Sequence, residues 1–174
     1  MNRELERLDD FRCRLPKTGS SNHFAEVQNV AEIYESRIAE AFGLFPNQIT
    51  VMIHPDTPAP YRHVGQPVLI PGDMGRYSYV MAGTARALDE TFGSACHGAG
   101  RLMSRSAAKR AVNGRSLLNE MQARGVHVMA AGMATVAEEM PEAYKDVADV
   151  VNVVHGAGLA TRVVQLRPLG VIKG

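Results

Sequence analysis

The sequence predicts a mixed α+β fold in a single domain, and three observations lead to that prediction. The chain has 174 residues, close to the size of one domain. Its composition, 45% apolar and 21% charged, is that of a globular protein. Strand-like and helix-like segments alternate along it without a strict strand–helix–strand rhythm and without a repeat. Such an irregular alternation favours α+β over a doubly wound parallel sheet.

The first half of the chain begins with a charged lead-in, expected over residues 1–18, and the domain is expected over 19–174. Apolar and β-branched runs predict strands at 23–30 and 49–54, and helical spacing predicts a helix over 32–45 that ends at Gly43. Three prolines make 55–65 a loop. Residues 66–84 predict two strands around a glycine turn, and 87–93 a short helix.

The second half continues with a glycine-rich turn and a helix within 93–112, the helix beginning near Gly100. A helix over 116–125, a strand over 126–131 and a helix over 142–158 follow. The tail, residues 161–174, predicts a last strand.

Composition excludes several classes of protein. No apolar run approaches the roughly 18 residues of a membrane span, and the charged start is unlike a signal peptide, so a cytoplasmic protein without membrane contact is expected. Cys13 and Cys96 are expected to be reduced thiols. The formal net charge is only +1, but its distribution is uneven. Residues 101–115 hold five bases and no acid, whereas 138–149 hold five acids and one base.

The sharpest local feature is the segment Gly-Ser-Ala-Cys-His-Gly-Ala-Gly-Arg, residues 93–101, which surrounds His97 with residues of small side chain. Small neighbours let a bulky ligand approach both the ring and the backbone. A helix starting near Gly100 would add an N-terminus that favours phosphate. Arg101, Arg105 and Lys109 follow at intervals of four, which predicts one basic face for a polyphosphate or a nucleic-acid backbone.

The residues also allow plainer interpretations. The glycine-rich segment fits an ordinary turn with a histidine packed in the core and a solvated basic face, and Cys96 fits small packing better than a nucleophile. His23 and His54 lie at ends of predicted strands, where imidazoles converge on a transition metal such as manganese or zinc, or serve structure alone.

Six stretches of this sequence resemble one known family, both in their residues and in their order along the chain. They are GSSNHFAEVQ, ITVMIH, QPVLIPGDMGRYSYVMAGT, ETFGSACHGAGRLMSRSAAKR, EAYKDV and PLGVIKG, between Gly19 and Gly174. Together they resemble RtcB, the GTP- and manganese-dependent RNA-splicing ligase, which joins an RNA 3′-phosphate or 2′,3′-cyclic phosphate to a 5′-hydroxyl in tRNA splicing and RNA repair. The resemblance therefore implies an RtcB-type domain, RNA (tRNA exon ends) and guanine nucleotide as partners, and Mn²⁺ and GTP as cofactors.

The resemblance also implies roles for individual residues. His97 matches the nucleophile that takes GMP from GTP, and His23 and His54 match two manganese ligands. The remaining matches are guanylate or phosphate contacts, namely Asn22, Glu26, Ser78, Ala99, Gly100, Arg101, Tyr144 and Lys173.

The chain departs from the family's pattern in two places. The family's Asp-x-Gly-Cys-Gly metal motif is absent, and VMIH runs into PDTPAPYRHVG where the family continues through a third histidine ligand. A member reduced by N-terminal truncation and by an internal deletion near 54–65 is the expected interpretation. With two of its ligands matched, such a site binds metal weakly. The remaining parts would close on themselves, pair with a second copy as a homo-oligomer, or stay partly ordered.

Three functions remain open from the sequence. The first is the family's RNA ligation through a histidine–GMP intermediate. The second is a catalytically incomplete relative that binds guanine nucleotide or RNA, or partners a full-length ligase, through the basic row of Arg101, Arg105 and Lys109. The third is a metal-dependent phosphohydrolase that uses His23 and His54.

Overall fold

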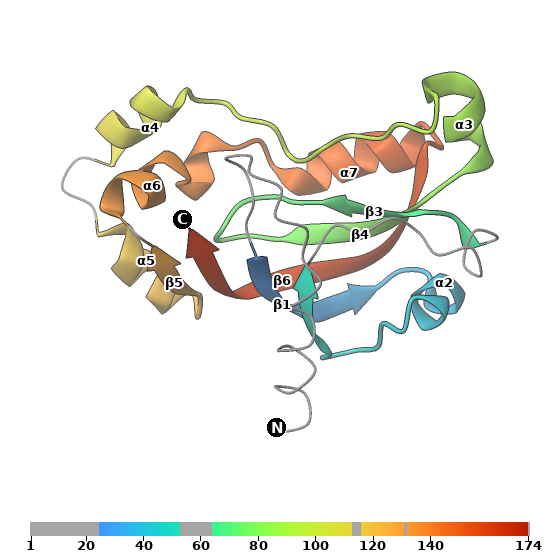
Figure 1. Cartoon of the computed structure of the whole chain (residues 1–174), viewed down its shortest axis with the longest axis horizontal. Helices are drawn as coiled ribbons and strands as arrows, with labels where there is room; N and C mark the ends of the chain where they lie inside the picture. The colour runs from blue at the N-terminus through green and yellow to red at the C-terminus, as the bar shows by residue number, and fades with distance from the viewer. Residues whose placement is uncertain (1–24, 53–63, 113–115, 131, 174) are drawn as a thin grey trace, which may run out of the picture.

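A curled sheet forms around the longest strand, β6 (Ala160–Lys173), in the computed structural model, which describes residues 25–52, 64–112, 116–130 and 132–173 (Figure 1). On one side β6 pairs antiparallel with β1 (Ala25–Ile33). On the other side it pairs antiparallel with β4 (Ser78–Gly83) and, through its last four residues, parallel with β5 (His127–Ala130). One strand therefore joins the two halves of the sheet.

Two short strands extend the sheet at its edges. β2 (Ile49–Met52) pairs antiparallel with β1, and β3 (Pro67–Ile70) pairs antiparallel with β4, so the order is β2-β1-β6-β4-β3 with β5 beside the end of β6. Every predicted strand is confirmed over its described residues. Together with the helices, the sheet confirms the predicted mixed α+β class. The lead-in predicted at 1–18 and the proline loop predicted at 55–63 lie outside the described residues.

The described α-helices are short, between six and ten residues, and one turn of 3₁₀ helix, η2 (Pro141–Ala143), precedes the last of them. In chain order they are α2 (Ser36–Ala41), α3 (Ala85–Thr91), α4 (Arg105–Ala111), α5 (Leu117–Ala123), α6 (Met133–Glu138) and α7 (Val147–Gly156). In Figure 1, α7 runs along β3 and β4, and α4, α5 and α6 gather at the end where β5 lies. A bilayer-spanning helix is absent from the described part of the chain.

Three predicted helices begin later than the sequence suggested. The helix predicted over 32–45 is limited to α2, because Ile33 still pairs with Val164 of β6 as a strand residue. The helix predicted from 142 begins at Val147, where Asp146 caps it by accepting a hydrogen bond from the Ala148 N–H at 2.8 Å. Side-chain caps and sheet pairing, rather than apolar spacing, set these starts.

The helix expected near Gly100 is the third of these, and it begins at Arg105. Gly100 has a φ of +76°, outside the helical range, and Ser104 caps α4 by accepting a hydrogen bond from the Ala107 N–H at 3.1 Å. The helix N-terminus that was expected to face a ligand beside His97 is therefore absent from that place.

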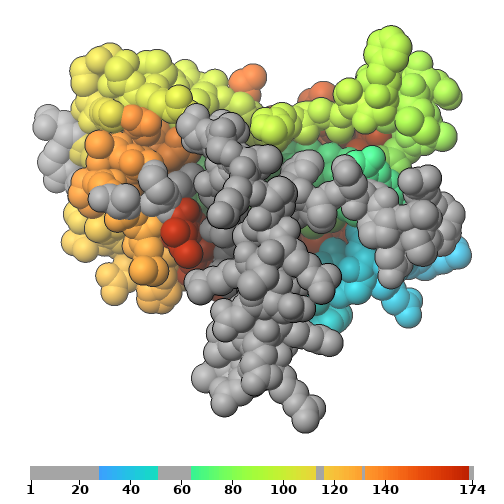
Figure 2. Space-filling model, in the orientation of Figure 1, coloured from blue at the N-terminus to red at the C-terminus, as the bar shows by residue number. Residues whose placement is uncertain are grey.

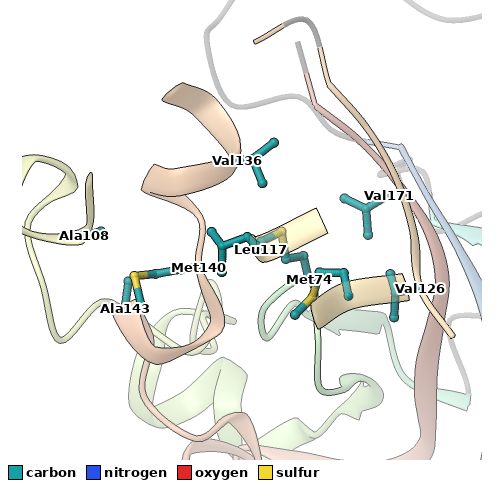
Figure 3. Packing of buried hydrophobic residues seen from close by; sticks show 9 residues of the cluster. Met74, Ala108, Leu117, Val126, Val136, Met140, Ala143 and Val171 are labelled. Atoms are coloured by element: carbon teal, nitrogen blue, oxygen red, sulfur yellow. The ribbon is translucent and has the colours of Figure 1, made fainter. Parts of the chain in front are cut away.

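Three apolar clusters fill the space between the sheet and the helices. One lies under α7 and another packs α2 against β1, β4 and β6. The third joins α4, α5 and α6 to the end of the sheet, and Figure 3 shows side chains from these elements converging around Leu117, Met140 and Met74. Burial of this kind of surface stabilises the fold by about 25 cal/mol for each Å² removed from water. It holds the segments that flank His97 on a fixed support.

Candidate functional site

His97 lies on the long connection from α3 to α4, and its side chain is exposed to solvent. Figures 1 and 2 show this connection at the surface, along the side of the molecule where α7 lies. The alternative of a histidine packed in the core is therefore wrong. Within the part of the chain that the structure describes, His97 makes no hydrogen bond or ion pair. The ring is available to an incoming group.

The backbone next to His97 is fixed on two sides. The Ala99 N–H donates a 2.9 Å hydrogen bond to the Pro71 carbonyl, and the Lys145 N–H donates a 3.0 Å hydrogen bond to the Gly100 carbonyl. A Cβ on Gly98 would lie 3.2 Å from the Pro71 carbonyl oxygen, so glycine permits this close approach. The glycine-rich segment 93–101 is thus seated between the turn 71–78 and the segment 141–146.

Arg101 ends the glycine-rich segment and is bound on several sides. Its guanidinium donates to the carbonyls of Met103 (3.0 Å) and Glu138 (2.5 Å) and to the Tyr144 hydroxyl (2.7 Å). It also pairs with the Glu139 carboxylate at 3.3 Å and lies 4.7 Å from the centre of the Tyr144 ring. Arg101 therefore connects the segment to α6 and to the residues that follow it.

Tyr144 takes part in the same network. Its hydroxyl donates a hydrogen bond to Glu139, and burial together with this carboxylate raises the pKa of the phenol above its ordinary value. The tyrosine stays protonated through the neutral range and acts as a hydrogen-bond donor.

The basic row predicted from spacing is paired internally. Arg105 and Lys109 reach the Glu138 carboxylate at 3.4 Å and 2.5 Å, and Arg101 reaches Glu139. Because α4 begins at Arg105, Arg101 is outside the helix that was expected to carry all three cations. The Lys109 ammonium holds the pKa of Glu138 below its ordinary value. The basic stretch and the acidic stretch noted in the sequence meet each other in the fold.

A second arginine, Arg76, lies in the turn 71–78, which is bonded to the glycine-rich segment through Pro71. Arg76 pairs with Asp73 at 2.5 Å, and the Asp73 side chain has no exposed surface. Asp73 also accepts hydrogen bonds from the backbone N–H groups of Gly75 (2.9 Å) and Arg76 (3.0 Å). Burial raises the pKa of the Asp73 carboxyl, and these donors oppose that rise. The carboxylate is thus held by one side chain and by its own turn.

The remaining predicted contacts fall into three groups. Ala99, Gly100, Arg101 and Tyr144 are linked by the backbone hydrogen bonds of the glycine-rich segment and by the bridge between Arg101 and Tyr144. Ser78 belongs to the adjoining turn, where its hydroxyl accepts a 3.4 Å hydrogen bond from the Gly72 N–H, and both Ser78 and Ala99 are buried. Glu26 and Lys173 are placed by their backbones, on adjacent strands at one end of the sheet, with Glu26 opposite Val171. Asn22, His23 and His54 lie outside the described residues.

No group of three or more histidine, cysteine, aspartate or glutamate side chains that suits a metal ion occurs among residues 25–52, 64–112, 116–130 and 132–173. The manganese ligands implied by the resemblance thus depend on His23 and His54. Cys96 packs half-buried against the cluster under α7, and burial raises the pKa of its thiol. This setting matches the packing role expected for Cys96.

Sequence reasoning missed the partners of the two arginines. Glu138 ends α6, a helix that was not predicted, and Glu139 follows it directly; they are 37 and 38 residues from Arg101. The Asp-x-x-Arg spacing in the turn 71–78 was a usable signal, since an aspartate commonly accepts hydrogen bonds from the amides that follow it in a turn.

Comparisons with known proteins cover almost the whole chain. The family model described as "tRNA-splicing ligase RtcB" matches residues 3–57 and 55–174. The tRNA-splicing ligase RtcB of Thermococcus kodakarensis is 60% identical over 121 residues, 70% of this chain and 25% of that protein. Its counterpart in Archaeoglobus fulgidus is 56% identical over 119 residues (68% and 25%), and that in Pyrococcus furiosus 57% over 121 residues (70% and 12%). The matched region spans a quarter or less of the length of these relatives.

Proposed function

This chain belongs to the tRNA-splicing ligase RtcB family, and from that premise we propose that it takes part in joining RNA ends through a guanylylated His97. The ends are an RNA 3′-phosphate or 2′,3′-cyclic phosphate and a 5′-hydroxyl, as in tRNA splicing and RNA repair. The observation that carries the proposal is the exposed imidazole of His97 on a backbone held by Pro71 and Lys145.

The proposed step is a substitution at the α-phosphorus of GTP. A neutral ring nitrogen of His97 attacks, a nitrogen–phosphorus bond forms, and the bond from the α-phosphorus to the bridging oxygen breaks. Pyrophosphate leaves with that electron pair, and the ring loses its N–H proton to solvent. The GMP then passes to the RNA 3′-phosphate.

The described residues contribute to the proposed reaction by holding the His97 ring in position, more than by supplying charge. The hydrogen bonds at Ala99 and Gly100 fix the backbone directly after His97 and so limit the motion of the ring, which favours attack on a nucleotide bound beside it. A Cβ on Gly100 would meet nothing closer than the Lys145 Cδ at 4.0 Å, so this side of the backbone leaves room for a nucleotide.

Mn²⁺ remains part of the proposal, with His23 and His54 as its ligands. Imidazole is a suitable donor for a divalent transition metal, and a metal on the triphosphate would offset its negative charge. The described residues offer no group of three or more side chains that would complete the ligand set.

A relative that only binds nucleotide or RNA is not favoured. The basic row that motivated it is paired with Glu138 and Glu139, so its charge is largely neutralised. No observation on the described residues favours the phosphohydrolase, whose two histidines lie outside them.

The test is intact-mass spectrometry after incubation with GTP and Mn²⁺. The chain is expected to gain the mass of one GMP, and His97→Ala is expected to gain none. His127→Ala, at another exposed histidine, on β5, is the matched control and should gain GMP as the unmodified chain does. Absence of the adduct on folded protein at millimolar Mn²⁺, or an adduct that survives His97→Ala, would contradict the proposal.

A further inference from the structure

Arg76 joins two segments that are far apart in the sequence. Besides its ion pair with Asp73, its Nη2 donates to the carbonyls of Pro141 (3.0 Å), Tyr144 (3.0 Å) and Lys145 (3.2 Å). Its Nη1 lies 3.6 Å from the Asp146 carboxylate, which caps α7. One guanidinium therefore connects the turn 71–78 to the segment 141–146.

These are the same two segments that hold the backbone beside His97. Pro71 accepts the hydrogen bond from Ala99, and Lys145 donates the hydrogen bond to Gly100. The three segments form a closed arrangement in which each is bonded to the other two. A change at Arg76 would alter the spacing of the two walls between which the glycine-rich segment sits.

We infer that Arg76 is a positioning residue for His97: through Asp73 and the carbonyls of 141–145, it fixes the walls that hold the glycine-rich segment in place for the nucleotide. It acts through the backbone, since none of its hydrogen bonds or ion pairs with described residues involves His97. The inference rests on the proposed function for its effect on nucleotide, and on geometry alone for its effect on the backbone.

The chemistry of arginine explains why this residue suits the task. Its planar guanidinium carries five N–H donors in a fixed fork, so it can bind a carboxylate and several carbonyls at once. Lysine keeps the charge beside the buried Asp73 but has a single ammonium, which cannot reach all of these groups together. Arg76→Lys therefore removes the hydrogen bonds to the carbonyls of 141–145 but keeps a positive charge beside Asp73. The buried carboxylate is not left unpaired.

Two measurements on the full chain test the inference. The first follows GMP adduct formation against GTP concentration for the unmodified chain, Arg76→Lys and the control Arg86→Lys. Arg86 makes an exposed ion pair with Glu90 on α3, at 2.8 Å. For Arg76→Lys the GTP concentration at half-maximal rate is expected to rise about tenfold, with a smaller change at saturating GTP. Arg86→Lys is expected to match the unmodified chain, and an unchanged GTP dependence for Arg76→Lys would overturn the inference.

The second measurement needs no nucleotide. Amide hydrogen exchange at Ala99 and Lys145 is expected to be about tenfold faster in Arg76→Lys, while the amides of β4 and β6 keep their rates. Equally faster exchange across the sheet would mean general destabilisation. Unchanged exchange at Ala99 and Lys145 would mean that Arg76 does not hold these segments together. Either result overturns the inference. If the unmodified chain forms no adduct, the proposed function fails, and the exchange measurement alone decides on Arg76.

As a second variant, Asp73→Asn with Arg76→Gln removes both charges of the pair together. It is expected to show the same selective acceleration at Ala99 and Lys145 as Arg76→Lys. If this double variant restores the unmodified exchange rates, the hydrogen bonds of the guanidinium are not what holds the walls, and the inference is overturned.

Discussion

The two ends of the short stretch from His97 to Arg101 differ sharply in how the fold treats them. His97 is exposed and makes no hydrogen bond or ion pair within the described part of the chain. Arg101, four residues later, has a 25% exposed side chain bonded to two carbonyls, a hydroxyl and a carboxylate. Both belong to the same glycine-rich segment, yet His97 is available to a ligand, whereas the guanidinium of Arg101 is hydrogen-bonded within the protein.

This difference shows that residues of one motif need not share one role. The partners of Arg101 fix the end of the segment, and the glycines between let the backbone pass close to Pro71 and Lys145. A rigid support of this kind is what a nucleophile needs, because it limits the ordering that must accompany ligand binding. We therefore expect substitutions at the two ends to separate stability from chemistry.

The largest effect on stability is expected for Arg101→Met. The substitution removes the hydrogen bonds of the guanidinium to Met103, Glu138 and Tyr144, and bonds involving charged groups are worth about 1.5–3 kcal/mol each in net terms. Because water reaches this 25% exposed side chain and takes over part of the bonding, a loss of about 2–3 kcal/mol in the free energy of unfolding, less than the sum of the bonds, is expected by urea denaturation. His97→Gln is the matched control, with a change within about 0.5 kcal/mol. Similar losses in the two variants would remove the distinction between the two ends.

A smaller effect is expected for Gly100→Ala, between the two ends. Gly100 has a φ of +76°, and the nearest atom to an added Cβ would be the Lys145 Cδ at 4.0 Å, so backbone strain rather than a clash sets the cost. That strain is about 1–2 kcal/mol for a non-glycine residue. Gly156→Ala, at the end of α7, where a Cβ meets nothing within 4 Å and φ is not positive, is the control and should be neutral or slightly stabilising in the same denaturation measurement. Equal stability of Gly100→Ala and the unmodified chain would show that the segment tolerates other backbone conformations.

The smallest effect is expected from Glu138, and it depends on pH. The Lys109 ammonium lowers the pKa of this carboxylate, so the pair stabilises the fold above the ordinary glutamate pKa of about 4.5 and loses that contribution as pH falls through the lowered value. Glu138→Gln is therefore expected to be less stable than the unmodified chain at pH 7, with the gap closing below about pH 4 and in high salt. Chemical denaturation from pH 7 to pH 3 measures this gap. If the difference in free energy of unfolding between the two proteins stays constant with pH, the charge of Glu138 does not contribute to the packing of α4 against α6.

The sequence by itself determined the local structure that depends on neighbours in the chain. Alternating and β-branched runs predicted the strands, and Gly43 and Gly125, with φ of +71° and +79°, follow the two helices that they were predicted to end. The glycine-rich segment around His97 was also identified in advance, because an unusual run of small residues is visible without coordinates.

The tertiary structure alone decided what the charged side chains do. The four-residue spacing of Arg101, Arg105 and Lys109 predicted a free basic face, but α4 begins at Arg105, and all three cations meet Glu138 or Glu139 at the end of α6. Arg76 likewise reaches carbonyls more than 60 residues away. Periodicity depends on the backbone within a few residues, whereas an ion pair depends on which distant surfaces the apolar core brings together. For this reason, only the folded chain shows that His97 is exposed and that Arg101 is bonded to distant residues.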